Sequence, residues 1–131
     1  MACYRRILMI DDDADDRLLF SLALKKVAPE ITAHYATDGE AALSILAEAM
    51  PDLIITDLNM PKMDGWQFIE ALRAKGSQTP VIIFSTTPEV KESIPKMGII
   101  GIYKKAFSMK ELHEKVLSMI STKIPLVVSS L

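Results

Sequence analysis

The sequence has little of several features that mark whole classes of protein. It contains a single cysteine, Cys3, so no internal disulfide can form, and this favours a reducing, cytoplasmic location. The formal net charge is −2, and a chain without a basic patch is a poor direct partner for nucleic acid. No apolar run approaches the roughly 18 residues that span a membrane. The apolar run near the N-terminus is too short for a secretory leader, and acidic residues follow it directly. These absences predict a cytoplasmic protein that binds neither nucleic acid nor membrane directly.

Internal repeats, low-complexity segments and interdomain linkers are also missing. The chain has 131 residues, of which 50% are hydrophobic, and this is enough to bury one core without disulfide or metal staples. We expect one domain over residues 1–122. Pro125 should stop the last helix, which leaves residues 123–131 as a short C-terminal tail.

What the sequence does contain is a regular alternation of short apolar runs with amphipathic stretches. Continuous apolar runs are typical of strands buried on both faces of a parallel sheet, and apolar residues spaced three or four apart are typical of helices. The predicted strands are residues 6–10, 31–36, 52–57, 80–85 and 98–103. The predicted helices are residues 14–27, 38–49, 64–75, 88–97 and 108–120, the fourth being the poorest because it contains Pro95.

This alternation predicts a parallel sheet covered by helices on both faces. With right-handed crossovers, the expected fold class is α/β, a flavodoxin-like doubly wound (βα)5 arrangement whose five strands stand in the order 2-1-3-4-5. In such sheets ligands bind beyond the carboxyl ends of the strands, near the point where the strand order reverses. The side chains that follow the strands are therefore the candidates for function.

Five aspartates occur in the stretch "IDDDADD", directly after the first predicted strand. Like-charged carboxylates about 4 Å apart cost on the order of 4 kcal/mol per pair at an effective dielectric of roughly 20, so something must offset their repulsion. Asp13 is predicted as the N-cap of the first helix, with Asp15 and Asp16 as first-turn acids that the helix dipole stabilises. Asp11 and Asp12 would then face the rim of the sheet.

Other predicted strands also end in polar side chains. Asp57 ends the third strand, Ser85 ends the fourth, and Lys104 and Lys105 follow the fifth. Clustered carboxylates favour a hard divalent cation such as Mg²⁺, and a lysine ammonium or a hydroxyl can bind phosphate oxygens. An aspartate can itself be the nucleophile that accepts a phosphoryl group. Together these residue types predict phosphoryl chemistry at the rim, achieved mainly by positioning and charge stabilisation.

Four motifs carry a resemblance to a known family. The acids after the first strand ("ILMIDDD"), the segment "DLIITDLNMPKMDG", the hydroxyl in "PVIIFST" and the lysine in "YKKAF" occur in the order and spacing of a response-regulator receiver domain. The resemblance covers roughly residues 5–121. The sequence is therefore similar to receivers of two-component signal transduction, of the CheY-like kind.

The resemblance implies a role for each rim residue. Asp57 corresponds to the phosphoacceptor, Ser85 to the hydroxyl residue that follows the phosphoryl group on activation, and Lys105 to the lysine that pairs with phosphoryl oxygens. Mg²⁺ or Mn²⁺ would be held directly by Asp12, mainly through water by Asp11, by Asp57, and by the backbone carbonyl of Asn59.

The resemblance also implies a function. A sensor histidine kinase or a phosphotransfer protein would donate the phosphoryl group, and the face formed by residues 88–97, 98–103 and 108–120 would then change its contacts with a downstream protein target. Such a protein is a signalling switch rather than an enzyme, although it takes part in its own phosphorylation and dephosphorylation. The output and the cognate kinase do not follow from the sequence.

The sequence departs from the family pattern at two places. The lysine is followed by Ala106 where a proline is usual, and a cis bond before alanine costs about 2.5–4 kcal/mol against 0.5–1 before proline. Ile102 stands where the family's switch aromatic usually lies. Its neighbour Tyr103 should point to the opposite face of the sheet, because side chains alternate along a strand.

Three alternatives remain at this point. A haloacid-dehalogenase-like phosphatase also uses aspartate and Mg²⁺, but Asp11-x-Asp13 is followed by Ala14 and Asp15 rather than by that class's pattern. A flavin or dinucleotide module would need a glycine-rich loop, and no Gly-x-Gly-x-x-Gly occurs. A receiver that signals unphosphorylated, through protein contact alone, is the third.

Overall fold

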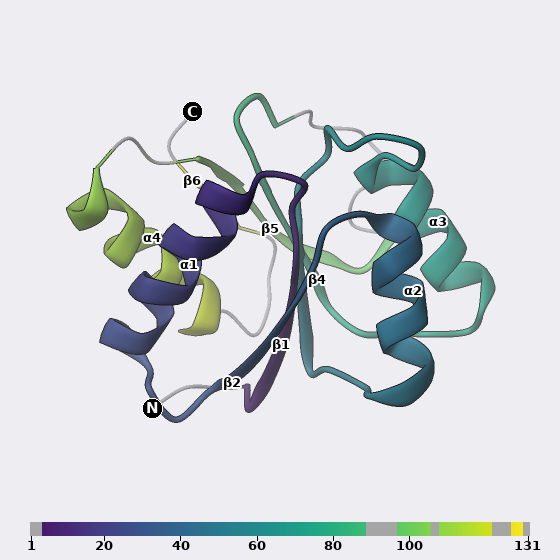
Figure 1. Cartoon of the computed structure of the whole chain (residues 1–131), viewed down its shortest axis with the longest axis horizontal. Helices are drawn as coiled ribbons and strands as arrows, with labels where there is room; N and C mark the ends of the chain where they lie inside the picture. The colour runs from purple at the N-terminus through teal and green to yellow at the C-terminus, as the bar shows by residue number, and fades with distance from the viewer. Residues whose placement is uncertain (1–3, 89–96, 106–107, 122–126, 130–131) are drawn as a thin grey trace.

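The computed structural model describes residues 4–88, 97–105, 108–121 and 127–129 (Figure 1). These residues form a single parallel sheet with helices on both faces, which confirms the predicted α/β doubly wound class. The predicted helix over residues 88–97 lies almost entirely outside the described residues, as does Ala106.

The sheet has the predicted order of its first five strands. They are β1 (Arg6–Ile10), β2 (Thr32–Ala36), β3 (Leu53–Thr56), β4 (Val81–Ser85) and β5 (Ile99–Lys104). A sixth strand, β6 (Val127–Ser129), pairs in parallel with β5, so the order is β2-β1-β3-β4-β5-β6. Part of the segment that we expected as a tail therefore extends the sheet, because β5 would otherwise present an unpaired edge.

In the part of the chain that the structure describes, four helices connect or cover the strands. They are α1 (Ala14–Val27), α2 (Gly39–Glu48), α3 (Gly65–Ala74) and α4 (Met109–Ser121). Figure 1 shows α1 and α4 together on one face of the sheet and α2 and α3 on the other. Among the described residues, no helix combines the length and apolarity needed to cross a lipid bilayer.

The sheet separates two apolar clusters, one under each pair of helices. Along β1, Ile7 and Met9 belong to the cluster under α1 and α4, whereas Leu8 and Ile10 belong to the cluster under α2 and α3. All four side chains are at most 1% exposed. A continuous apolar run is therefore required, since each successive side chain enters a different core. This double burial holds the carboxyl ends of the central strands rigidly in place.

The helix starts also follow from local sequence. The Asp13 side chain accepts hydrogen bonds from the N–H groups of Asp15 and Asp16 and caps α1, as predicted. Asp64 and Gln67 form a reciprocal capping box at the start of α3. These caps fix where α1 and α3 begin, directly beyond the carboxyl ends of β1 and β3.

Candidate functional site

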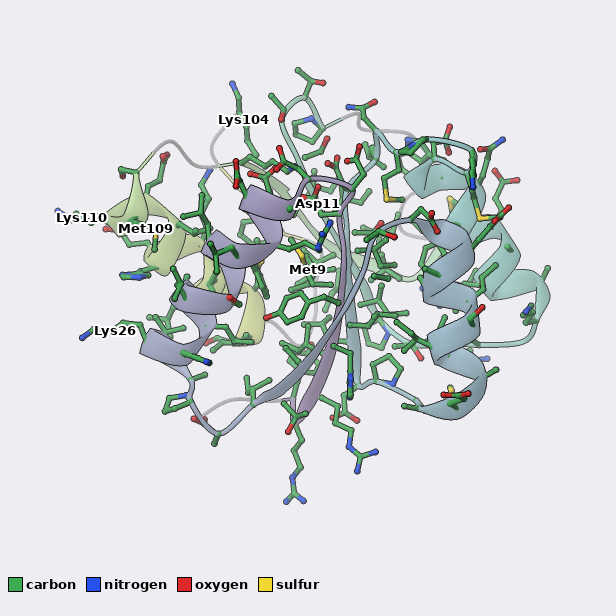
Figure 2. The ribbon with its side chains drawn as sticks, viewed as in Figure 1. Met9, Asp11, Lys26, Lys104, Met109 and Lys110 are labelled. Atoms are coloured by element: carbon green, nitrogen blue, oxygen red, sulfur yellow. The ribbon has the colours of Figure 1, made fainter. Side chains whose placement is uncertain are left out.

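The carboxyl ends of β1, β3 and β5 bring three predicted site residues together. The register pairs Ile10 of β1 with Thr56 of β3, so the residues that follow these strands, Asp11 and Asp57, lie side by side. Lys105, which follows β5, reaches across to both. Figure 2 shows Asp11 just beyond the end of β1, at the same end of the sheet as Lys104. The strand order therefore assembles a site from residues up to 94 positions apart in the chain.

The Asp57 carboxylate is buried and held on one side by the backbone. The backbone N–H of Asp57 donates a hydrogen bond to the carbonyl of Ile10 at 3.0 Å. Its Oδ1 accepts hydrogen bonds from the N–H groups of Leu58 at 2.7 Å and Asn59 at 3.2 Å. The side chain is only 6% exposed. Oδ1 is therefore held in position, and Oδ2 is the oxygen that contacts the Lys105 ammonium.

Asp11 is the most buried carboxylate of the site, with a side-chain exposure of 1%. Its Oδ1 accepts the N–H of Asp13 at 3.0 Å, and its Oδ2 forms an ion pair with Lys105 at 2.8 Å. Burial raises the pKa of Asp11 to about 6, because the charged form loses water, although Lys105 and the Asp13 N–H favour the charged form and partly oppose this. A cation bound beside Asp11 would favour its charged form and so offset the cost of burying it.

The Lys105 ammonium contacts three carboxylates. Its Nζ donates to Asp57 Oδ2 at 2.8 Å and to Asp16 Oδ2 at 2.6 Å, in addition to the ion pair with Asp11. Burial acts to lower the pKa of Lys105, but the hydrogen bonds that its ammonium donates to these carboxylates outweigh burial, and the net pKa is raised. The backbone N–H of Lys105 donates to the carbonyl of Ser85 at 2.9 Å, so the position of the lysine is tied to the end of β4.

Asp11, Asp12 and Asp57 can offer oxygens that all lie within 4.8 Å of one another. Asp12 is exposed, whereas the other two are buried, so the trio is open on one side. A set of oxygen donors with an open side fits Mg²⁺, which keeps several waters and takes one or two carboxylates from the protein. The residues present are therefore compatible with the predicted cation.

Ser85 lies at the end of β4 and is fully buried. Its Oγ has no hydrogen-bond partner among the described residues. Buried hydroxyls are normally satisfied, so an unpartnered one beside a polar site is a candidate for binding an additional group. Asn59 is exposed in the loop after Asp57, where its N–H is used by Asp57 Oδ1.

Ile102, which stands at one of the two sequence departures, and its neighbour Tyr103 are both buried. Ile102 packs in the cluster under α2 and α3. Tyr103 points to the other face, where its hydroxyl lies 2.7 Å from Ser118 Oγ on α4. The alternation predicted for this pair is therefore observed, and the tyrosine is held by α4.

Sequence reasoning missed two residues of the site. Asp16 was interpreted only as a helix-dipole residue, and Lys115 of α4 was not considered, yet Lys115 is 7% exposed and its Nζ donates to the Lys104 carbonyl at 2.6 Å. Asp16 shares its sequence surroundings with Asp15, the neighbouring first-turn acid, so no local signal singled it out. No signal marked Lys115 either.

The fold and site define a doubly wound α/β protein with a cluster of aspartates beside a lysine. The sequence profile of the response regulator receiver domain matches residues 7–117, and the chain therefore belongs to this family. It is a receiver domain of the two-component type, the class of signalling switches that the motifs indicated. Membership of this family removes the support for the phosphatase and cofactor-binding alternatives.

Individual relatives agree with this assignment. The chain is 35% identical over 117 residues to a probable transcriptional regulator, ycf27, of Porphyridium aerugineum, an alignment that covers 88% of this chain and 48% of the relative. It is 31% identical over 115 residues to the regulatory protein AtoC of Escherichia coli, covering 86% of this chain and 24% of AtoC. The chain thus spans about half or less of the length of these curated relatives.

Solved structures agree as well. The chemotaxis response regulator CheY4 of Vibrio cholerae is 30% identical, with a TM-score of 0.72 and coverage of 88% of this chain and 98% of CheY4. The phosphorylated cyanobacterial phytochrome response regulator RcpA, at 22% identity, shares the fold with a TM-score of 0.74.

Proposed function

We propose that this chain is a phosphoacceptor switch, in which Asp57 takes a phosphoryl group from a histidine kinase or a phosphotransfer protein in the cytoplasm. The observation that carries the proposal is the contact of Lys105 Nζ with Asp57 Oδ2 at 2.8 Å, beside the Asp11–Asp12–Asp57 trio. A nucleophile, a cation site and a phosphate-binding ammonium then share one rim, as in-line phosphoryl transfer requires.

Asp57 is the nucleophile of this proposal. Because Oδ1 is occupied by two backbone N–H groups, Oδ2 is the oxygen that attacks phosphorus. A P–O bond to Asp57 forms as the bond from phosphorus to the donor breaks, and the donor imidazole leaves with the electron pair and takes up a proton. The product is an acyl phosphate, which water later hydrolyses to the free carboxylate and inorganic phosphate.

Lys105 and Ser85 bind the transferred group. The ammonium that contacts Asp57 Oδ2 would move to a phosphoryl oxygen, and charge-assisted hydrogen bonds of this kind are about twice as strong as neutral ones. The unpartnered Ser85 hydroxyl would donate to a second phosphoryl oxygen. A change at the ends of β4 and β5 would then alter the contacts of β5 and the helices beside it with a downstream target.

Asp11, Asp12 and Asp57, with the backbone carbonyl of Asn59, would hold Mg²⁺ or Mn²⁺. When bound, the cation neutralises charge that builds up on the phosphoryl oxygens during transfer. The three carboxylates otherwise repel both one another and an anionic donor. In this proposal the chain works as a switch that is set once per donor molecule, and not as an enzyme that turns over a free substrate.

The test is phosphorylation by a small donor. The chain is incubated with acetyl phosphate and Mg²⁺, and intact mass is measured for the wild type, Asp57→Asn and Asp52→Asn. Asp52 is the matched control, because it adjoins the opposite end of β3 and its carboxylate accepts the N–H groups of Arg5 and Arg6.

We expect the wild type and Asp52→Asn each to gain the mass of one phosphoryl group, and Asp57→Asn to gain none. The added group should be acid-labile. The gain should disappear when the metal is chelated. No mass gain in the wild type would overturn the proposal.

A further inference from the structure

Lys105 contacts a third carboxylate in addition to those of the rim residues Asp11 and Asp57. The third is Asp16, in the first turn of α1, whose Oδ2 lies 2.6 Å from Nζ and makes the shortest of the three contacts. Asp16 is 89 positions from Lys105 in the chain. In Figure 1 the first turn of α1 lies directly beside the loop that leaves β1, which places this helix start at the rim.

Asp16 contacts the lysine without belonging to the metal trio. The oxygens that lie within 4.8 Å of one another come from Asp11, Asp12 and Asp57. Asp16 instead borders a small hollow of about 30 Å³ with Lys105, and the other lining residues, Leu19, Phe84 and Leu112, are apolar. An ion pair with apolar surroundings on one side is less screened than one in open water.

Two of the three contacts, to Asp16 and Asp57, are hydrogen bonds that Lys105 Nζ donates, and the third, to Asp11, is an ion pair at 2.8 Å. An ammonium has three N–H groups and no acceptor, so three carboxylates can occupy all of them. A phosphoryl group on Asp57 needs at least one. Asp16 is the partner that can be displaced most easily, because its side chain is 32% exposed whereas those of Asp57 and Asp11 are 6% and 1% exposed.

The geometry points to Asp16 as an internal competitor for Lys105, a positioning residue that holds the lysine in the unphosphorylated state and must release it when Asp57 is phosphorylated. This inference rests on the proposed function, since it names a residue that regulates the same site. Asp16 slows phosphoryl acceptance in two ways: it occupies the donor that the incoming oxygen needs, and its charge repels an anionic donor.

Asp15 provides a matched control. It is the neighbouring first-turn acid of α1, its side chain is exposed, and no contact to Lys105 involves it. Asp15→Asn and Asp16→Asn remove the same charge from the same turn and lose the same helix-dipole stabilisation. A difference between the two variants therefore isolates the contact with Lys105.

Two measurements on the full chain test the inference. The first is the initial rate of phosphorylation by acetyl phosphate with Mg²⁺, followed by intact mass. The second is the affinity for beryllofluoride, a tetrahedral mimic of the phosphoryl group, measured with Mg²⁺ by the emission of the single tryptophan, Trp66. We expect Asp16→Asn to raise both by about two- to fivefold over Asp15→Asn, the range of one partly exposed ion pair.

The comparison with Asp15→Asn separates competition from a general loss of negative charge, and the affinity measurement removes the chemical step. If only the rate rises, or if Asp16→Asn matches Asp15→Asn in both measurements, or if either quantity falls, the inference is wrong. Failure of the proposed function looks different, because the wild type itself would then take up no phosphate on Asp57.

Discussion

The buried ammonium of Lys115 donates a hydrogen bond to the backbone carbonyl of Lys104, across a distance of 2.6 Å. This contact joins α4 to the last residue of β5, immediately before the lysine that pairs with Asp57. Glu111 lies near the same ammonium at 3.9 Å. The end of β5 is therefore anchored from the helix side by a charged group.

We expect Lys115→Met to destabilise the protein by about 1–3 kcal/mol, because a charge-assisted hydrogen bond is lost while the aliphatic bulk is kept. Urea unfolding measures the change. Lys110→Met is the control, since Lys110 is exposed on the same helix. The rate of Asp57 phosphorylation should also fall in Lys115→Met alone, because the placement of Lys105 depends on Lys104. Equal behaviour of the two variants would contradict this role.

Gly65 is required where α3 begins against the loop after β3. A Cβ atom there would lie 2.3 Å from the carbonyl oxygen of Asp57 and 2.8 Å from Leu58 Cα, so backbone must move. We expect Gly65→Ala to cost about 1–3 kcal/mol, as overpacking does, and to reduce Mg²⁺ affinity by displacing Asp57.

Gly76→Ala is the comparison, since nothing lies within 4 Å of its Cβ position and its φ of +87° imposes only a local cost of about 1–2 kcal/mol. Isothermal titration with Mg²⁺ separates the two variants. An unchanged Mg²⁺ affinity in Gly65→Ala would show that the loop adjusts without moving the carboxylate.

Asp11 makes the metal-free protein less stable as the pH rises. Its folded pKa of about 6 lies above its ordinary value of 3.8, because of burial, so the folded state binds more protons than the unfolded state between these values. Stability from this group is thus present at pH 4 and is lost as the pH rises through 6. In EDTA at pH 7.5, Asp11→Asn should be more stable than the wild type by about 1–3 kcal/mol.

The difference should vanish near pH 4 and should reverse when saturating Mg²⁺ stabilises the wild type. Thermal unfolding across this pH range, with and without the cation, is the measurement. A wild type that is the more stable protein in EDTA at every pH would mean that the Lys105 ion pair outweighs the burial of the carboxylate.

Arg73 binds the loops at the opposite end of the sheet. Its guanidinium donates to the carbonyls of Met97 at 2.7 Å, Thr79 at 2.8 Å, Ser77 at 3.2 Å and Gly98 at 3.3 Å. A lysine ammonium cannot donate to all four of these carbonyls, because it has fewer N–H groups and lacks the planar, branched geometry of the guanidinium. We expect Arg73→Lys to lose about 1–3 kcal/mol in urea unfolding, with Asp57 phosphorylation unchanged. Lys75→Ala, exposed nearby, should stay within about 0.5 kcal/mol of the wild type.

Much of the fold could be predicted because its signals are local. Runs such as the one from Ile7 to Ile10 are short and apolar at every position, which is typical of a strand buried on both faces. The cap at Asp13 was also predictable, since it depends on residues two and three positions away. The motifs placed Asp11, Asp57 and Lys105 at strand ends, and the strand order then brought them together.

The residues missed by sequence reasoning depend on distant partners. Asp16 has the same sequence surroundings as Asp15, and only the packing of α1 beside the end of β5 turns one of them toward Lys105. Lys115 sits in an amphipathic helix where a lysine normally faces water, yet the carbonyl of Lys104 lies within its reach. The pairing of β6 with β5 likewise depends on an edge that the short run at residues 127–129 does not reveal.

The sequence by itself determined the segments that form β1 to β5 and helices α1 to α4, and the residue types that end these strands, because these depend on short-range periodicity and residue type. The tertiary structure decided which carboxylates share one ammonium. Short distances decide this pairing: Asp16 Oδ2 lies 2.6 Å from Lys105 Nζ, and Coulomb and hydrogen-bond energies change steeply over such distances. Spacing along the chain carries no information at that scale.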